Sequence, residues 1–306
     1  MGTERTTVLY VGGMPRSGST LLDLMLGQLA GHVEVGELFY LWQSGVERNF
    51  RCACGNHFRD CPFWTEVGEK AYGGWDNVDL AEVQRLQRRV DSTSKLPLIL
   101  MPALKPGFRR EMDRYLELIE PLYKAIANVA GAKVVVDSTK RPSLAYLLRR
   151  APGIDLRLVH VLRDPRGVAY SWSQAVELPE GTALRKHMKT RSPVLIGRRW
   201  VTVNAMLSRL GVPTTTLRYE DLVRDPKPVM AKVAALTGTD DPLDFIDGST
   251  FTHGGSHTVA GGRIRMKHGP ITLKLDEKWR REYPAGPRRL VAALTWPLRL
   301  RYGYRS

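Results

Sequence analysis

The chain has 306 residues, of which 46 are Lys or Arg and 31 are Asp or Glu, so its formal net charge is +15. Hydrophobic residues make up 43% of it and charged residues 25%. This composition excludes an intrinsically disordered or collagen-like chain and allows a sizeable core. Three cysteines are too few for a disulfide scaffold, which favours a reducing, cytoplasmic location. We find no apolar run long enough to span a membrane and no signal-peptide pattern.

Predicted strands and helices alternate along the chain. Strands are predicted at 6–13, 133–138, 155–163 and 214–219, and the segment 32–38 is ambiguous. Helices are predicted at 19–29, 79–92, 107–130 with a break or kink at Pro121, 142–150, 165–176, 192–210, 226–237, 276–282 and 287–301. The alternation predicts an α/β fold in one domain over 1–306, with a central parallel sheet covered on both faces. The segments 49–65 and 251–270 are predicted to be loops.

The positive charge predicts an anionic partner. Because no helix-turn-helix, zinc-finger or RNA-binding signature is present, nucleic acid is not the expected partner. A multiply charged small molecule is the sharper interpretation. The basic, partly amphipathic segment 288–304 could touch a membrane surface, although a packed helix is favoured. The sequence carries no signal for an oligomeric state.

The first strand leads into a glycine-rich loop. Residues 13–20 match the phosphate-binding pattern G-x-x-x-x-G-K-[ST] except that Ser19 takes the Lys position. Glycines allow consecutive N–H groups to face one anion, and the following helix N-terminus adds positive potential. The predicted anion ligands are Gly18, through its backbone, and Arg16, Ser17, Ser19 and Thr20. The missing Lys counts against ordinary ATP hydrolysis.

A second anion-binding element follows the strand 155–163. This strand delivers Arg163 to the carboxyl edge of the sheet, where ligands bind in open α/β folds. A turn and a helix follow, and the helix carries Ser171 eight residues later. Arg163 and Ser171 could therefore hold one phosphate from two sides.

Together the two elements resemble the sulfotransferases that use 3′-phosphoadenosine 5′-phosphosulfate (PAPS). The chain is most similar to the bacterial branch related to carbohydrate and tyrosylprotein sulfotransferases. The resemblance implies a three-layer fold like that of P-loop NTPases, with the 5′-phosphosulfate held at 15–20 and the 3′-phosphate at Arg163 and Ser171. It implies sulfuryl transfer from PAPS to a carbohydrate, lipid, phenol or peptide hydroxyl. The product nucleotide is 3′-phosphoadenosine 5′-phosphate (PAP), and no metal is required.

The same resemblance suggests catalytic residues. Glu37 occupies a place similar to that of an acidic residue in the tyrosylprotein-type relatives, and we expect it to be the general base. Glu34 is the rival. Lys140 is expected to contact the sulfonate or the acceptor, and Arg16 to stabilise the leaving phosphate. In the segment before Lys140, Asp137 or Ser138 could instead cap the following helix.

Two further segments are expected to lie over the nucleotide or form a lid. In 251–270, Gly261, Arg265 and Lys267 resemble the family's basic loop over the nucleotide. The region 45–105 is expected to form a lid-like insertion. It holds Cys52, Cys54 and Cys61, which lie in one short segment with His57. Free thiols are the favoured interpretation, a disulfide and a zinc site stay open, and no residue is assigned to a metal.

Two other functions stay open at this stage. A P-loop kinase-like, ATP-dependent phosphotransferase would need the Lys that Ser19 replaces. A non-catalytic nucleotide-binding protein would show no group transfer, and its binding would be unchanged by Glu37→Gln.

Overall fold

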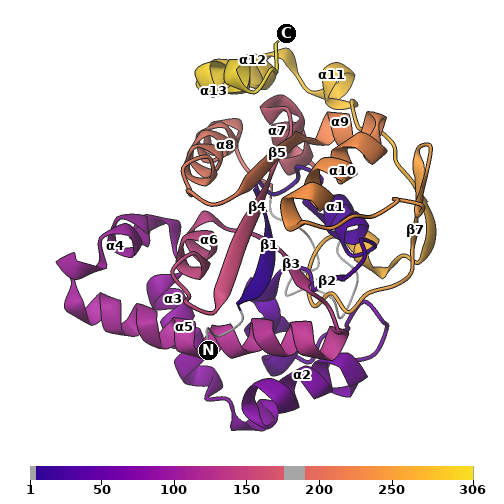
Figure 1. Ribbon diagram of the computed structural model, residues 1–306. Helices are drawn as coiled ribbons and strands as arrows, with labels where there is room; N and C mark the ends of the chain where they lie inside the picture. Colours follow the sequence, from indigo (N-terminus) through magenta and orange to yellow (C-terminus); the bar gives the residue numbers. More distant parts are fainter. Residues whose placement is uncertain (1–4, 176–189, 306) are drawn as a thin grey trace.

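A five-stranded parallel sheet forms the centre of the computed structural model, which describes residues 5–175 and 190–305 (Figure 1). Its strands are β1 (Thr6–Gly13), β2 (His32–Glu34), β3 (Val134–Lys140), β4 (Ile154–Leu162) and β5 (Thr214–Arg218). The spatial order is β2-β3-β1-β4-β5, and every neighbouring pair is parallel. The predicted central parallel sheet is therefore confirmed, and the ambiguous segment 32–38 contributes a short edge strand.

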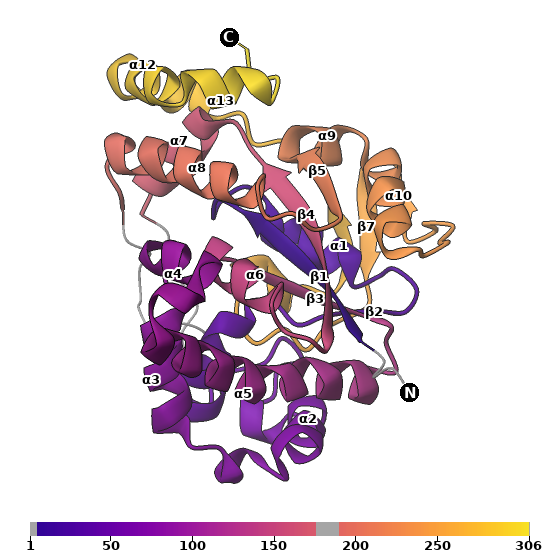
Figure 2. The same ribbon diagram turned by 60° about the vertical axis from the view of Figure 1, so that its left-hand side comes forward.

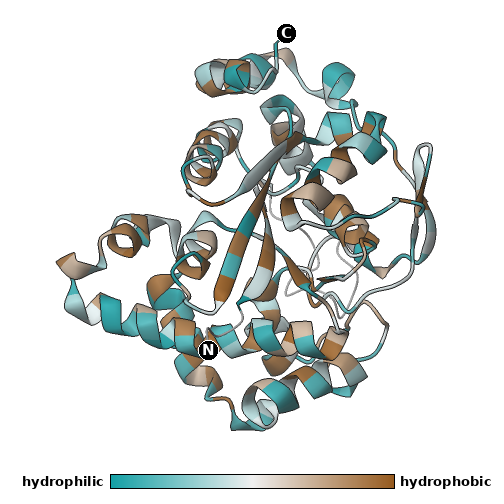
Figure 3. Ribbon diagram, viewed as in Figure 1, coloured by the Kyte–Doolittle hydropathy of each residue, from teal (hydrophilic) through white to brown (hydrophobic). Residues whose placement is uncertain are grey.

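Helices cover both faces of this sheet. One layer contains α1 (Ser19–Leu26), α9 (Tyr219–Arg224) and α10 (Pro226–Thr237), and the other contains α5 (Pro106–Ala130), α6 (Pro142–Leu148) and α8 (Pro193–Leu207). Figure 2 shows the sheet between the two layers. Side chains of β1 alternate between them, because Leu9 and Val11 pack with the first layer and Val8 and Tyr10 with the second. Hydrophobic residues gather along the central strands (Figure 3).

The remaining helices lie at the two ends of this sandwich. Between β2 and α5 the chain forms α2 (Pro62–Tyr72), α3 (Leu80–Val90) and α4 (Leu96–Leu100), which lie with α5 on the lower side of Figure 1. After β4 come α7 (Pro165–Ser173) and, near the C-terminus, α11 (Trp279–Glu282), α12 (Ala285–Leu294) and α13 (Trp296–Arg301). The C-terminal helix α12 packs against α7 and α8. The helix predicted at 165–176 ends at Ser173, and position 176 lies outside the described residues.

Three sequence-based expectations about elements were wrong. α2 begins inside the segment expected to be a loop, because Trp64 and Val67 bury one helical face after Pro62 at the helix start. Pro121 does not break α5, which is one helix from Pro106 to Ala130 with Ile119 and Leu122 buried. The ends of 251–270 form β7 (Thr250–His253) and β8 (Gly269–Thr272), which join β6 (Ile246–Asp247) in an antiparallel sheet. Phe251 and Ile271 are opposite each other and buried.

Among the described residues, no helix is both long and apolar enough to cross a membrane. Trp296, at the start of α13, leaves 58% of its surface exposed.

Candidate active site

Four segments carrying predicted site residues end at one edge of the sheet. The phosphate-binding loop follows β1, Lys140 ends β3, Arg163 follows β4, and Glu37 follows β2. Gly12 of β1 is the register partner of Lys140, and Gly13 is the partner of Val161 near the end of β4. The carboxyl ends of parallel strands meet at this edge, so the topology gathers these residues from distant parts of the chain.

The loop after β1 has the backbone conformation of an anion cradle. Arg16 and Gly18 both adopt positive φ, at 78° and 84°, which turns successive N–H groups toward one side. Ser17 and Ser19 are buried. Within the described residues, the Ser17 hydroxyl and the Arg16 Nε have no hydrogen-bond partner. Buried polar atoms without partners are rare, and donors of this kind fit an anionic ligand.

Gly18 is a loop position that tolerates a side chain poorly. Its φ favours glycine, and an added Cβ would lie 2.4 Å from the Tyr219 ring. We expect Gly18→Ala to lower the free energy of unfolding by about 2 kcal/mol or more and to weaken nucleotide binding, as measured by denaturant unfolding and calorimetry. Gly131 is the matched control, because its φ is +59° and its Cβ would meet nothing within 4 Å. Equal losses in the two variants would contradict this account.

The two predicted anion-binding elements contact each other. Arg163 is buried, and its Nη1 donates to the Arg16 carbonyl at 3.0 Å. Arg16 Nη2 in turn donates to the Ser171 carbonyl on α7 at 3.3 Å. Burial lowers the pKa of Arg16, and the positive charge of Arg163 lowers it further. The buried guanidinium of Arg163 and the half-buried guanidinium of Arg16 repel each other, and an anion between them would stabilise both.

Arg163 also has a partner that sequence reasoning missed. Its Nη2 pairs with the Asp276 carboxylate at 2.9 Å, and its guanidinium lies 4.8 Å from the centre of the Tyr219 ring. Arg163 and Asp276 are 113 positions apart in the sequence, too far for a local pattern to reveal the contact. A phosphate at Arg163 would therefore share the guanidinium with Asp276 or displace the carboxylate.

Glu37 and Lys140 form an ion pair at the same edge. Lys140 Nζ lies 2.8 Å from Glu37 Oε1, and the two side chains are 7% and 17% exposed. Lys140 Nζ also donates to the Ser138 carbonyl at 2.7 Å. The backbone φ of Lys140 is +68°, a strained value for a residue with a Cβ. Such strain is common at functional sites, and here it accompanies a lysine held against a partly accessible carboxylate.

The rival carboxylate, Glu34, lies elsewhere. It is buried in β2, and its Oε1 lies 3.2 Å from His253 Nε2 on β7. Burial raises its pKa. Asp137 is also buried and accepts hydrogen bonds from Thr139 and Tyr123, whereas Arg141 occupies the N-cap position of α6. The structure thus brings Glu37, and not Glu34, to Lys140.

Only the first residues of the segment 261–267 contact the predicted phosphate-binding loop. Gly261 lies against Thr20, and the N–H of Gly262 donates to the Thr20 hydroxyl at 3.3 Å. Arg265 is buried, and its guanidinium donates to the carbonyls of Thr258 and Arg51 at 2.6 and 2.9 Å. Lys267 is exposed. The backbone near Gly261 therefore covers the loop, and the Arg265 guanidinium is directed to the cysteine segment.

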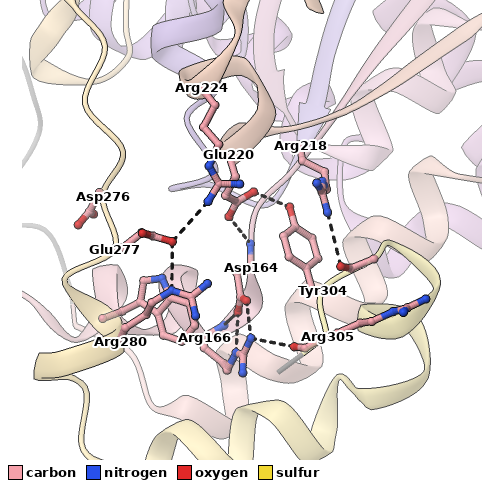
Figure 4. A pocket seen from close by; sticks show the side chains of 12 residues that line it. Asp164, Arg166, Arg218, Glu220, Arg224, Asp276, Glu277, Arg280, Tyr304 and Arg305 are labelled. Carbon is pink, nitrogen blue, oxygen red and sulfur yellow. Dashed lines mark hydrogen bonds and ion pairs between the residues drawn. The ribbon is translucent and has the colours of Figure 1, made fainter.

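A charged pocket adjoins Arg163 through Asp276 (Figure 4). Its arginines are largely neutralised within the pocket region, since Arg166 pairs with Asp164 at 2.7 Å and Arg280 with Glu277 at 3.1 Å. Glu220 accepts a hydrogen bond from Tyr304 at 2.8 Å. These pairs offset part of the positive charge that the arginines bring to the pocket.

A parallel α/β sandwich with a glycine-rich loop after its first strand is the architecture of P-loop NTPase-like folds. Residues 9–242 match the sulfotransferase family, and the chain belongs to this family. It is 27% identical over 179 residues to carbohydrate sulfotransferase 5 of Mus musculus, a match that covers 53% of this chain and 45% of that protein. The chain thus matches less than half of that relative's length.

A solved structure with a TM-score of 0.50 supports the same fold. The sulfotransferase domain of the Synechococcus PCC 7002 olefin synthase superposes with a TM-score of 0.50 and 20% identity, over 95% of this chain and 94% of that one. The sulfotransferase domain from the curacin biosynthetic pathway gives a TM-score of 0.49 and 18% identity, over 95% and 96%. The predicted P-loop NTPase-like fold with a central parallel sheet is confirmed.

Proposed function

We propose that this protein transfers a sulfuryl group from PAPS to an acceptor hydroxyl. One observation carries the proposal: the loop at 13–20 and the Arg163 element contact each other beside the Glu37–Lys140 ion pair. PAPS has phosphates at both the 3′ and the 5′ positions of its adenosine. A nucleotide with two anionic ends needs two linked cationic sites, and sulfuryl transfer also needs a base for the incoming hydroxyl.

The proposed reaction assigns a role to each group. The carboxylate of Glu37 accepts the proton of the acceptor hydroxyl while the acceptor oxygen bonds to sulfur. The bond between sulfur and the 5′-phosphate oxygen breaks, and the electron pair stays on PAP. Arg16 and the N–H groups at the start of α1 stabilise the charge that develops on that oxygen. Lys140, held beside Glu37, orients the sulfonate.

The residues proposed to bind the nucleotide extend over three segments. Ser17, Gly18, Ser19 and Thr20 would hold the 5′-phosphosulfate with Arg16, and Arg163 and Ser171 would hold the 3′-phosphate. The segment of Gly261, Arg265 and Lys267 would cover the nucleotide, with Gly261 already packed on Thr20. The acceptor is proposed to be a small molecule, or a carbohydrate, lipid or peptide that presents a hydroxyl.

The direct test of this function is a transfer assay. We expect the purified protein to move ³⁵S from labelled PAPS to at least one member of a panel of carbohydrate, phenol, lipid and peptide hydroxyls, releasing PAP. The matched arm replaces PAPS with γ-labelled ATP and Mg²⁺, and we expect no phosphoryl transfer there. Transfer from ATP but not from PAPS would overturn the proposal in favour of a kinase.

A further inference from the structure

Three thiols and one imidazole meet in a cluster that contains none of the proposed catalytic residues. The ligand atoms of Cys52, Cys54, Cys61 and His257 all lie within 4.8 Å of one another. The cysteines come from the segment before α2, and His257 comes from the segment between β7 and β8. Cys52 and Cys61 are buried, and no cysteine forms a disulfide. Two segments about 200 residues apart thus place four metal-ligating groups in one cluster.

The spacing of these atoms fits a tetrahedral metal centre. Four ligands at zinc–sulfur and zinc–nitrogen distances of about 2.3 and 2.1 Å lie about 3.5–3.8 Å from each other in a tetrahedron. In this cluster Cys61 Sγ is 3.6 Å from Cys54 Sγ and 3.8 Å from Cys52 Sγ. His257 Nδ1 is 3.2 Å from Cys61 Sγ and 3.8 Å from Cys52 Sγ. A cation at the centre needs little rearrangement.

The fourth ligand differs from the one offered by the local sequence. His57 lies within the cysteine segment, but it is exposed and its Nδ1 faces the Asn49 carbonyl at 2.8 Å. His257 is held in place instead. Its ring stacks on Phe63 with centroids 4.8 Å apart, and its carbonyl accepts a hydrogen bond from Trp64 Nε1 at 2.8 Å. The aromatic residues at the start of α2 therefore orient the imidazole.

A buried positive charge lies beside the cluster. A centre of three thiolates, one neutral imidazole and one divalent cation carries one net negative charge. Arg265 donates to the carbonyls of Arg51 and Thr258, the residues that flank Cys52 and His257 in sequence. Among the described residues, no carboxylate forms an ion pair with Arg265 within 4.0 Å. A thiolate centre would therefore act as a counter-charge for Arg265, together with the carboxylate of Glu37, which lies beyond ion-pair distance but still acts on it electrostatically.

We propose that Cys52, Cys54, Cys61 and His257 bind one structural zinc ion. Thiolate ligands and tetrahedral geometry select zinc among the common divalent ions. With four protein ligands the centre is closed to substrate. Thiol protons leave to solvent as the zinc–sulfur bonds form.

Such a centre would link the cysteine segment to the loop that touches the candidate active site. The chain after His257 passes Ala260, whose carbonyl accepts the N–H of Glu37 at 3.1 Å, and Gly262, which bonds Thr20. The zinc ion would therefore fix the backbone that covers both the Glu37 segment and the phosphate-binding loop. The zinc proposal depends on the cluster alone and is independent of whether the protein transfers a sulfuryl group.

The test measures bound metal and its ligands. Protein purified without added chelator is expected to hold one zinc ion per chain by mass spectrometry of the metals. Exchange with Co²⁺ is expected to give the strong visible d–d bands and thiolate charge-transfer absorption of a tetrahedral cobalt–thiolate centre. Removal of zinc is expected to lower the melting temperature and to expose three reactive thiols.

Matched histidine variants identify the fourth ligand. His257→Ala is expected to weaken zinc affinity at least about 100-fold, and His57→Ala in the same region to retain it. His257→Cys keeps a soft fourth ligand, so it is expected to bind zinc and shows that metal loss in the Ala variant is not due to misfolding. A chain that neither contains zinc nor binds Co²⁺, a disulfide in the native protein, or equal loss in the two Ala variants would overturn the proposal.

Discussion

Replacing Glu37 by Gln is expected to lower kcat for sulfuryl transfer about 100- to 10,000-fold while PAP binding is unchanged. The amide keeps the size of the side chain and removes its ability to accept the hydroxyl proton. It also removes the charge that pairs with Lys140 Nζ at 2.8 Å. Steady-state kinetics with labelled PAPS, together with calorimetric binding of PAP, separates the loss of chemistry from a loss of binding.

Glu34→Gln is the matched control for that experiment. Glu34 lies three residues earlier, but it contacts His253 and is buried away from Lys140. We expect it to lower the melting temperature while the protein that remains folded keeps its kcat. If Glu34→Gln lost kcat and Glu37→Gln did not, the assignment of the base would be wrong.

Arg163→Ala is expected to weaken PAP binding about 10- to 100-fold and to leave AMP binding nearly unchanged. This range corresponds to the loss of one hydrogen bond between charged groups, because one such bond contributes about 1.5–3 kcal/mol. The selectivity arises because only PAP has a 3′-phosphate for Arg163. Calorimetric titration of both nucleotides into the wild-type and variant proteins measures the difference.

Arg157→Ala controls for the loss of a positive charge. Arg157 lies on β4, the strand that ends one residue before Arg163. Its guanidinium pairs with the Asp155 carboxylate at 2.9 Å and donates a hydrogen bond to the Leu236 carbonyl. Because Arg157 lies away from the carboxyl edge of the sheet, we expect the Arg157→Ala variant to bind PAP and AMP with the affinities of the wild type. Parallel losses for PAP and AMP in Arg163→Ala would indicate a general charge effect and contradict a specific 3′-phosphate site.

The local sequence was enough to predict the sheet and the glycine-rich turn at 13–20. Continuous apolar runs such as 133–138 identify buried parallel strands. Glycines and hydroxyl residues at fixed spacing identify the loop at 13–20, because each has a backbone or donor role there. The contact of Arg163 with this loop depends on the strand order, which the sequence did not give, because β1 and β4 are neighbours only in the folded sheet.

Contacts between distant loops could not be predicted in the same way. His257 joins the cysteines across the molecule, whereas the local pattern pointed to His57. Asp276 reaches Arg163 from a C-terminal segment without a periodic pattern. The strands β7 and β8 were missed because Phe251 and Ile271 become a buried pair only once the two ends of the segment meet. Long-range packing decides each of these features.

The most direct measurement of the central claim is a crystal structure of the protein with PAP. The account predicts one nucleotide at the carboxyl edge of the sheet, with its 5′-phosphate on the backbone of 16–20 and its 3′-phosphate on the side chains of Arg163 and Ser171. Glu37 and Lys140 are predicted to face the free oxygen of the 5′-phosphate. PAP bound elsewhere, or bound with its 3′-phosphate in solvent while Arg163 stays paired with Asp276, would contradict it.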